Sequence, residues 1–378
     1  MKKIGIIGTG FISVGLFNLI LSQKRFLVSG VLTRSDISSR EGVQKSYMTN
    51  SLEELIDASD IIVECSGRVL DAAENIDIIM KNNIPVVTMN TEFHVTVGSY
   101  FVDKGFITEG EGDQPGSIAA LHEEATMMGF KPKVYGNIKG FLNNDPTLED
   151  MEFWAKKSNL SLDMVTSFTD GTKVQMEQAF VANGLGATIL KKGLSALEGP
   201  NMEEHGNTLA QEAEKMGTSI SDYVISSTGP AGVFVTATHD EEQKQALAYY
   251  KLGNGPYYTL VKPFHLPHLE LYKTIIRVAD GGSVLLNNSS NPTISVAAIA
   301  KQDLKIGEVI PKAIGSFKCR GEAIKIRDYP NHIPIGLIEG ATLLKDIKRD
   351  DIITFDDLKI DNNVAIEIWH KILKKALK

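Results

Sequence analysis

A lysine and a carboxylate four residues apart are the side chains best suited to acid–base chemistry in this sequence. Lys173 and Glu177 follow Asp170 in the run DGTKVQME, and residues four apart lie on the same face of a helix. A lysine ammonium stabilises charge on a substrate oxygen, and a nearby carboxylate orients it and exchanges its proton. The same spacing also occurs in ordinary surface ion pairs. The sequence leaves both interpretations open.

Three other polar segments carry candidate substrate contacts. The loop 261–270 (VKPFHLPHLE) holds two histidines and an acid, but their spacing matches no helix-borne zinc pattern. Contact of His265 with substrate is therefore one interpretation, and a structural histidine is the other. The glycine-rich stretch 110–117 (GEGDQPGS) leads into a helix expected over 118–128 and either presents backbone N–H groups to a ligand or turns the chain between domains. Lys139 lies in a polar loop after a strand that starts near Lys133. Another strand is expected over 165–168 (VTSF), shortly before Asp170.

The residues best suited to hold a pyrophosphate stand at the start of the chain. A short β-branched strand over 3–7 runs into GTGFIS, and helical periodicity follows over 11–21. Gly8 permits a tight turn and Gly10 lets the backbone approach a phosphate, while the helix start presents free N–H groups. Ser13 replaces the third glycine of the usual pattern and is still small enough for close packing. This order predicts a Rossmann unit.

The second expected strand, 26–32, ends where NAD enzymes usually place an acid beside the adenosine ribose. Here Thr33, Arg34 and Ser35 come first, and Asp36 follows one step later. A guanidinium and two hydroxyls suit a 2′-phosphate, so NADP(H) is favoured, and the alternative is a solvated loop charge. Strands expected over 60–67 and 84–89 end at the same sheet edge. The predicted cofactor contacts are Gly8, Gly10, Phe11, Ile12, Arg34, Ser35, Ser66, Gly67 and Asn90.

Composition narrows the classes of partner. The chain has 39 basic and 47 acidic residues, a net charge of -8 and two cysteines. An acidic protein of this kind is a poor match for nucleic acid or an anionic membrane, and scarce cysteine fits a reducing compartment. The first apolar run is short and interrupted by glycine, so it predicts a strand rather than a signal segment. We expect a soluble cytoplasmic protein that acts on a small molecule.

The C-terminal part contains an internal similarity. The segments 298–310 (AIAKQDLKIGEVI) and 343–353 (LLKDIKRDDII) share an apolar–Lys–x–Asp–apolar–Lys core. The sequence therefore predicts an α/β protein assembled from four parts. These are a Rossmann dinucleotide-binding domain (1–115), an α+β catalytic and oligomerisation domain (116–290), a small mainly-β module (294–361) and a C-terminal helix (362–378).

Five stretches together resemble a known family. They are MNTEFHVTVGSY (89–100), GEGDQPGS (110–117), GNIKGFLNN (136–144), FTDGTKVQMEQAFVANGLG (168–186) and KPFHL (262–266). They are similar to the deoxyxylulose-phosphate reductoisomerase-like (DRL) group of NAD(P)-dependent oxidoreductases, within the homoserine dehydrogenase superfamily. The C-terminal module resembles a SAF domain, the type found in sialic acid synthases and antifreeze proteins. In homoserine dehydrogenases a lysine follows the Asn90 position, whereas Thr91 and Glu92 follow it here. This departure counts against homoserine dehydrogenase itself.

The resemblance implies a set of roles for the polar residues. The superfamily supplies a catalytic Asp and Lys after a strand, which Asp170 and Lys173 match. Lys173 or Lys139 would then stabilise an oxyanion, and Glu177 or Glu92 would shuttle a proton. The expected substrate contacts are Glu92, Asp113, Ser117 and His265. A divalent metal is expected only by analogy with the unrelated classical reductoisomerase, and the sequence shows no dedicated ligand cluster for it.

The implied reaction is reduction by NADPH. The named candidate is reductive isomerisation of 1-deoxy-D-xylulose 5-phosphate to 2-C-methyl-D-erythritol 4-phosphate, an isoprenoid precursor. The alternative is a dehydrogenase of another sugar, polyol or hydroxy acid, in surface-polysaccharide synthesis. A third possibility is a redox sensor without catalysis, against which Asp170 and Lys173 argue. The resemblance also implies a homo-oligomer.

Overall fold

The first third of the chain forms a six-stranded parallel sheet. The computed structural model describes all 378 residues and orders the strands β3-β2-β1-β4-β5-β6, with every pairing parallel. The strands are β1 (Lys3–Ile7), β2 (Leu27–Leu32), β3 (Met48–Thr49), β4 (Ile61–Glu64), β5 (Val86–Thr88) and β6 (Ile107–Glu109). The strand order reverses between β1 and β4, which is where dinucleotides bind in such sheets. The predicted Rossmann fold is confirmed.

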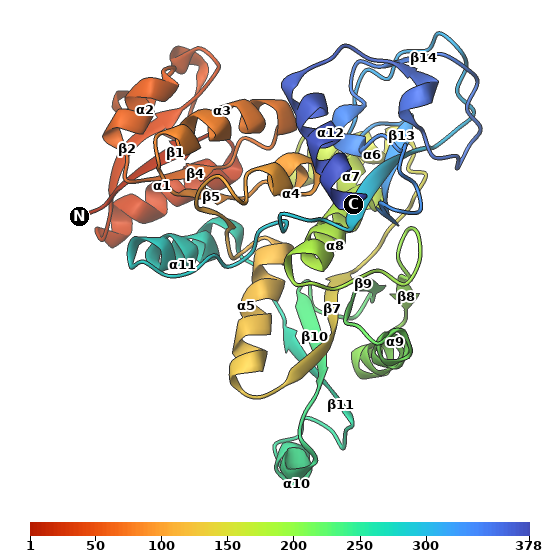
Figure 1. Cartoon of the computed structure of the whole chain (residues 1–378). Helices are drawn as coiled ribbons and strands as arrows, with labels where there is room; N and C mark the ends of the chain where they lie inside the picture. The colour runs from red at the N-terminus through yellow and green to blue at the C-terminus, as the bar shows by residue number, and fades with distance from the viewer.

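The helices of this domain come from two distant parts of the chain. The local ones are α1 (Phe11–Gln23), α2 (Leu52–Ala58), α3 (Val69–Lys81) and α4 (Thr91–Val97). Helix α11 (Pro267–Ala279) returns to pack along α1 (Figure 1). Gly15 allows this approach, since a Cβ there would lie 2.5 Å from the ring of His268. The expected 116–290 domain therefore contributes one helix to the first domain.

The middle domain is a five-stranded mixed sheet ordered β11-β10-β7-β9-β8. Its strands are β7 (Lys131–Lys139), β8 (Leu197–Glu198), β9 (Ile220–Ile225), β10 (Val233–Thr238) and β11 (Tyr257–Lys262). Helices α5 (Gln114–Met127) and α8 (Thr172–Gly184) cover one face, α9 (Met202–Met216) covers the other, and α10 (Lys244–Tyr249) lies at the hairpin tip. Alternate residues of β7 face opposite ways, because Val134 packs in the α9 cluster and Tyr135 in the core beneath α5 and α8.

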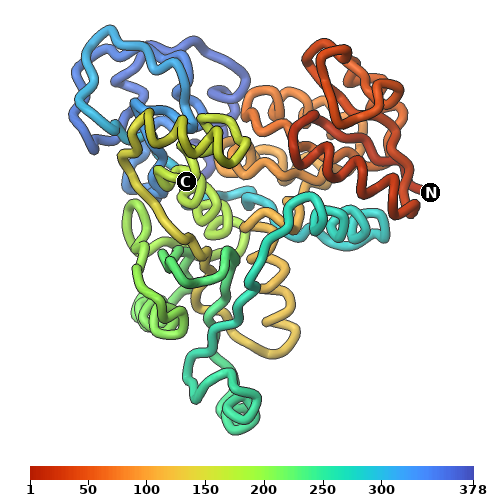
Figure 2. The backbone as a smooth tube through the Cα atoms, turned by 180° about the vertical axis from the view of Figure 1, so that it is seen from behind, coloured from red at the N-terminus to blue at the C-terminus, as the bar shows by residue number.

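The segment between β7 and α8 differs from its prediction. Residues 165–168 were expected to be a strand, but they lie inside helix α7 (Leu162–Thr169), which follows α6 (Leu148–Ser158). Ser161 caps α7 by accepting a hydrogen bond from the Met164 N–H (3.4 Å). The four-residue run of β-favouring side chains was too short to outweigh this cap and the amphipathic pattern around it. Figure 2 shows the segment beside the C-terminal module, and Asp145 and Asp163 form ion pairs with that module.

The C-terminal module is mainly β, as predicted. Its strands are β12 (Ile294–Ala300), β13 (Cys319–Lys325), β14 (Thr342–Leu343) and β15 (Leu358–Lys359). The two similar segments pair with each other through bridges at Ile299–Ile352 and Leu304–Ile347. The final helix, α12 (Val364–Ala376), packs against α3 and α4 with Trp369 buried. None of the helices has the length and apolar character needed to cross a bilayer.

Candidate active site

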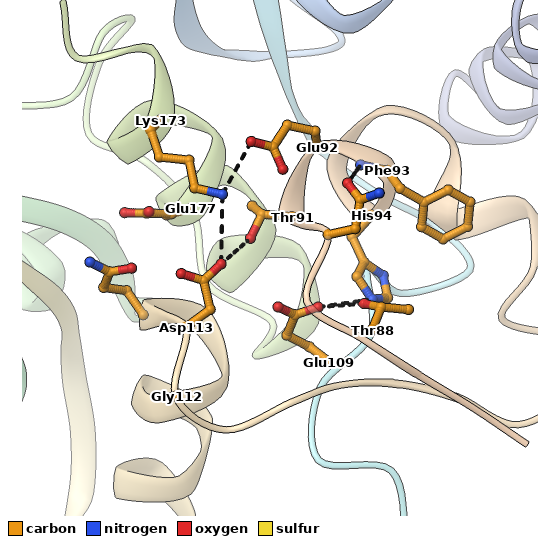
Figure 3. Close-up of polar contacts among 12 residues, drawn as sticks. Thr88, Thr91, Glu92, Phe93, His94, Glu109, Gly112, Asp113, Lys173 and Glu177 are labelled. Carbon is orange, nitrogen blue, oxygen red and sulfur yellow. Dashed lines mark hydrogen bonds and ion pairs between the residues drawn. The ribbon is translucent and has the colours of Figure 1, made fainter. Parts of the chain in front are cut away.

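Lys173 lies in the first turn of α8, where three elements meet. Gly171 begins the helix with a φ of 82°, a backbone angle that favours glycine. The Lys173 Nζ lies 3.2 Å from Glu92 Oε1 on α4 and 3.6 Å from Asp113 Oδ2, just before α5 (Figure 3). Thr91 Oγ1 donates to the same Asp113 oxygen at 2.9 Å. The lysine and both carboxylates remain about one-seventh exposed, so a small molecule can reach them.

The carboxylates keep Lys173 protonated. Burial alone lowers the pKa of Lys173, but the charges of Asp113, Glu92 and Glu177 outweigh burial and raise that pKa above its usual range. Burial likewise raises the pKa of Asp113, but the charge of Lys173 and the Thr91 hydrogen bond bring that pKa below its usual value. The site therefore presents an ammonium donor flanked by carboxylate acceptors. Such a group stabilises charge on a substrate oxygen and donates a proton to it.

Glu177 lies one turn further along α8 and pairs with β7 rather than with Lys173. Its Oε2 accepts hydrogen bonds from Asn137 Nδ2 (2.7 Å) and Lys139 Nζ (3.0 Å). Burial raises the pKa of Glu177 despite the charge of Lys139. The two helix residues share a face as expected, but they form no direct ion pair. The structure thus brings together Lys173, Glu177, Lys139, Glu92 and Asp113, which come from four separate segments of the sequence.

The loop 261–270 and the glycine-rich stretch 110–117 meet beside this cluster. Gln114 lies between Asp113, Glu177 and His265, and the sequence analysis missed it because an isolated glutamine carries no motif. Ser117 is buried and accepts a hydrogen bond from the Gly112 N–H (3.3 Å), so it holds the loop and does not face the cluster.

Lys262 stabilises the base of the same loop. Its Nζ bonds to Glu111 at 2.8 Å and forms a second ion pair with Glu270. Glu270 also accepts a hydrogen bond from the Leu266 N–H (2.8 Å). His268 packs against Phe11 and Gly15 on α1. Of the loop's polar side chains, His265 is the one that the structure places next to the cluster.

Asp170 does not join the Lys173 cluster, contrary to the sequence prediction. Its Oδ2 lies 2.6 Å from Lys301 Nζ in the C-terminal module, and its Oδ1 accepts a hydrogen bond from the Thr172 N–H (2.8 Å). Asp170 and Lys301 are both buried. Gly171 turns the chain between Asp170 and the helix, so the side chains of Asp170 and Lys173 reach different partners. We assign Asp170 a structural role.

The glycine turn after β1 has the geometry expected for a dinucleotide. Gly8 has a φ of 111°, and a Cβ there would lie 3.0 Å from the Cys65 carbonyl oxygen. A Cβ at Gly10 would meet nothing within 4 Å, which leaves its outer surface open. No side chain caps the start of α1, so the N–H groups of Phe11 and Ile12 stay available. Ser13 is buried beneath the turn.

The end of β2, where the adenosine ribose would lie, is rich in arginine. Arg34 forms an ion pair with Asp71, which Arg68 also contacts at 3.2 Å. Arg40 donates a hydrogen bond to Ser35 Oγ. Asp36 accepts a hydrogen bond from the Ser38 N–H (2.8 Å) and so caps a short helical turn. The only acid in the predicted ribose position is thus already engaged locally.

A buried glutamate links the ends of β4 and β5, at the nicotinamide side of the sheet. Glu64 accepts hydrogen bonds from the Ser66 N–H (2.7 Å) and from Asn90 Nδ2 (3.0 Å), and burial raises its pKa. Asn90 Oδ1 in turn accepts from the Phe93 N–H (3.0 Å) and caps α4. This network fixes the backbone that carries Glu92. Sequence analysis assigned Glu64 only to a buried strand.

The side chains present do not form a metal site of the usual kind. No group of three or more His, Cys, Asp or Glu side chains is arranged to hold an ion. The two carboxylates that lie beside Lys173, those of Glu92 and Asp113, both face its ammonium. The donor set therefore does not fit the divalent metal that was expected by analogy.

Comparison with known proteins identifies the segment that carries most of this cluster. Residues 112–271 match the family described as oxidoreductase DRL, catalytic domain. This segment includes Asp113, Lys139, Lys173, Glu177 and His265, whereas Glu92 precedes it. The match supports an oxidoreductase with a nicotinamide cofactor. No curated protein sequence matches the chain.

Solved structures align only distantly. A Clostridium difficile dehydrogenase (MviM) aligns at 14% identity over 76% of this chain and 94% of its own, with a TM-score of 0.43. An S. aureus homoserine dehydrogenase aligns at 12% identity over 74% and 76%, with a TM-score of 0.41. UDP-N-acetylglucosamine 3-dehydrogenase GnnA from Acidithiobacillus ferrooxidans aligns at 9% identity over 76% and 92%, with a TM-score of 0.43. At these scores none of them bears on the site.

Proposed function

We propose that this chain, whose residues 112–271 match the catalytic domain of the oxidoreductase DRL family, reduces a carbonyl group of a small polyhydroxylated substrate with NADPH. The observation that carries this proposal is the position of Lys173. In a Rossmann domain the nicotinamide lies at the carboxyl ends of the strands near the point of reversed order. Glu92 stands just beyond β5 at that edge and contacts Lys173. This position supports the proposal of an ammonium donor beside the site of hydride transfer.

Lys173 acts as the general acid in this proposal. When bound, NADPH supplies the hydride to the carbonyl carbon. As the C=O electrons move onto oxygen, Lys173 stabilises the developing charge and transfers a proton from Nζ, so that an alcohol forms. Glu92 and Asp113 hold the ammonium in place and favour its return to the charged form after turnover. The reverse reaction, oxidation of an alcohol, uses the same groups with the proton moving to Lys173.

The proposed preference for NADP(H) rests on the charged residues at the end of β2. Arg34, Arg40 and Arg68 provide positive charge there, and the carboxylate of Asp36 is used as a cap. A 2′-phosphate would compete with Asp71 for Arg34 and Arg68. These contacts support NADP(H) over NAD(H).

The named substrate candidate is 1-deoxy-D-xylulose 5-phosphate, which rests on the DRL match. Glu92, Asp113 and Glu177 provide acceptors for sugar hydroxyls, and Lys139 is the nearby cation that a phosphate would meet. The alternative is a dehydrogenase of another sugar, polyol or hydroxy acid. Since each lysine in the cluster already faces a carboxylate, unphosphorylated sugars belong in the first assay.

The test follows NADPH and NADH oxidation by absorbance with 1-deoxy-D-xylulose 5-phosphate, its unphosphorylated form, and a panel of ketoses and polyols. Each assay runs with and without divalent metal, and product analysis shows whether the carbon skeleton has rearranged. Lys173→Met should abolish turnover with NADPH affinity unchanged, whereas Lys191→Met, at an exposed lysine, should be neutral. Absence of NADPH binding, or full turnover in Lys173→Met, would overturn the proposal.

A further inference from the structure

The side-chain amide of Gln114 lies between three ionisable groups. With its nitrogen turned toward the carboxylates, it donates to Asp113 Oδ1 at 2.8 Å and to Glu177 Oε1 at 3.2 Å. Its oxygen then lies 3.2 Å from His265 Nε2. The opposite orientation would set the amide oxygen against two carboxylate oxygens, with no proton between them. The charges around it therefore select one orientation of the amide.

His265 completes this pattern. Its Nε2 faces the Gln114 oxygen, and its Nδ1 lies 3.3 Å from the Gly112 carbonyl oxygen. A carbonyl oxygen only accepts hydrogen bonds, so both ring nitrogens must donate, which is the pattern of an imidazolium. A neutral ring would leave one nitrogen without a proton against a carbonyl oxygen. Since His265 is half-buried, it stays in contact with solvent.

The contacts continue from Gln114 to the reacting end of Lys173. Asp113 uses Oδ1 for Gln114, and its Oδ2 accepts from Thr91 and faces Lys173. Glu177 uses Oε1 for Gln114, and its Oε2 accepts from Asn137 and Lys139. Each carboxylate oxygen thus has its own partner. Without the amide, one oxygen of each carboxylate would lose its donor, which is unfavourable for a largely enclosed charged group.

We propose that His265 and Gln114 are positioning residues for Lys173: the imidazolium of His265 orients the Gln114 amide, which holds Asp113 and Glu177 as carboxylates on either side of the lysine. This inference rests on the proposed role of Lys173 and assigns to His265 an action through Gln114 instead of substrate contact. Other charged groups surround the contacts from His265 through Gln114 to the two carboxylates. They are Glu92, Lys139 and Lys173 on the side of Lys173, and Glu111, Lys262 and Glu270 at the base of the loop 261–270.

Loss of one proton from His265 reverses the pattern. When Nε2 has lost its proton it accepts a hydrogen bond. The Gln114 amide therefore rotates, with its nitrogen toward His265 and its oxygen toward Asp113 and Glu177. Those two groups lose two donors and favour their protonated forms, which weakens their hold on the Lys173 ammonium. The proposal therefore predicts lower turnover on the alkaline side, where the ring is neutral, and a variant without an ionisable side chain at this position lacks that alkaline limb.

A first experiment needs no substrate. Nitrogen-15 NMR of the imidazole rings in the NADP+-bound protein, at neutral pH, should show His265 with both nitrogens protonated. His265→Gln identifies the signal. A neutral ring with an unprotonated Nε2 would overturn the proposal whether or not a substrate is known.

A second experiment uses kinetics with the best substrate from the panel. His265→Phe should lower kcat by about 10- to 100-fold, the cost of a small misplacement of reacting groups, and leave KM within about threefold. His265→Gln keeps an N–H near the Nε2 position, so it should recover most of kcat while losing the alkaline limb. His268→Gln, at the neighbouring histidine in the first turn of α11, is the matched control and should be neutral.

The outcomes separate this inference from the proposed function. If Lys173→Met is inactive while His265→Phe and Gln114→Leu keep full turnover and the same pH profile, the inference fails and the proposed function stands. If Lys173→Met keeps turnover, the proposed function fails, and the NMR result alone decides the charge state of His265. Circular dichroism and thermal unfolding check that each variant is folded.

Discussion

Asp170 and Lys173 are three residues apart, and each forms a lysine–aspartate contact with a distant partner. The two contacts differ in how accessible they are to solvent. Asp170 lies 2.6 Å from Lys301, which also donates to the Ser316 carbonyl oxygen at 2.5 Å and faces the ring of Phe317. Lys173 lies 3.2 and 3.6 Å from its two carboxylates and stays partly exposed. The Asp170–Lys301 contact is almost inaccessible to solvent and connects the middle domain to the C-terminal module. The Lys173 ammonium remains accessible, as the proposed general acid requires.

Burial and charge alone therefore do not distinguish Lys173, the general acid that we propose, from Lys301. Both lysines are largely enclosed and both face aspartate. The two lysines differ in solvent exposure and in the number of carboxylates that they face. Lys173 faces Glu92 and Asp113, whereas Lys301 faces Asp170 alone. Four perturbations break or sharpen this comparison.

The largest expected effect is that of Lys173→Met on turnover. Loss of a general acid lowers kcat by about 100- to 10,000-fold, whereas thermal stability should change little because the site is partly open to water. Steady-state kinetics and thermal unfolding measure both. Strong destabilisation with per-molecule turnover retained would make Lys173 a second structural tie and remove the contrast.

Lys301→Met should produce the opposite pattern. It leaves the buried Asp170 without its cationic partner, which costs about 3–5 kcal/mol of unfolding free energy, while turnover per folded molecule should survive. Adding Asp170→Leu should restore most of the stability, since a buried pair is often replaceable by apolar side chains. Lys348→Met, which breaks the exposed pair with Asp303, is the control and should cost less than about 1 kcal/mol. Urea unfolding measures all three.

Arg34→Ala extends the comparison to a charge that we assign to the cofactor. A lost charge-assisted contact to a 2′-phosphate should raise the KM for NADPH by about 10- to 100-fold. The KM for NADH should stay unchanged, because NADH lacks that phosphate. Equal effects on both cofactors would mean that Arg34 supports the fold and does not read the phosphate.

Glu109→Gln tests a third kind of buried pair, in which burial disfavours the charged form of both partners. Burial lowers the pKa of His94 to about 3 and raises that of Glu109 well above its usual range, and the two side chains lie 3.4 Å apart. Folding therefore disfavours a proton on His94 and favours one on Glu109, so the two effects oppose each other between the usual pKa values of the two groups.

The variant should uncover the titration of His94. Its folded pKa is lower than its unfolded value of 6.5, so the unfolded chain binds more protons at acid pH. Stability should then decrease by about 1 kcal/mol for each pH unit below 6.5. Urea unfolding between pH 7 and pH 5 measures the slope, roughly the range in which histidine titrates. A slope identical to that of the parent protein would show that the two groups do not titrate as a pair.

Local patterns were sufficient for most of the elements. The strand–glycine–helix start, the parallel Rossmann strands and the amphipathic C-terminal helix all follow from periodicity and glycine placement. The strand expected at 165–168 was wrong, because four residues do not distinguish a strand from a capped helix turn. The return of α11 to the first domain was not predicted, since no local signal tells a helix which distant face it will cover.

By itself, the sequence determined that a dinucleotide fold is present and that Lys173 and Glu177 share one face of a helix, because both depend on a few neighbouring residues. Only the tertiary structure decided which carboxylates meet Lys173. Glu92 lies 81 residues before it, and Asp113 reaches it from a third element. The same packing gave Asp170 to the C-terminal module. Contacts between residues far apart in the sequence depend on how separate helices and strands pack, and the spacing of residues along the chain does not determine that packing.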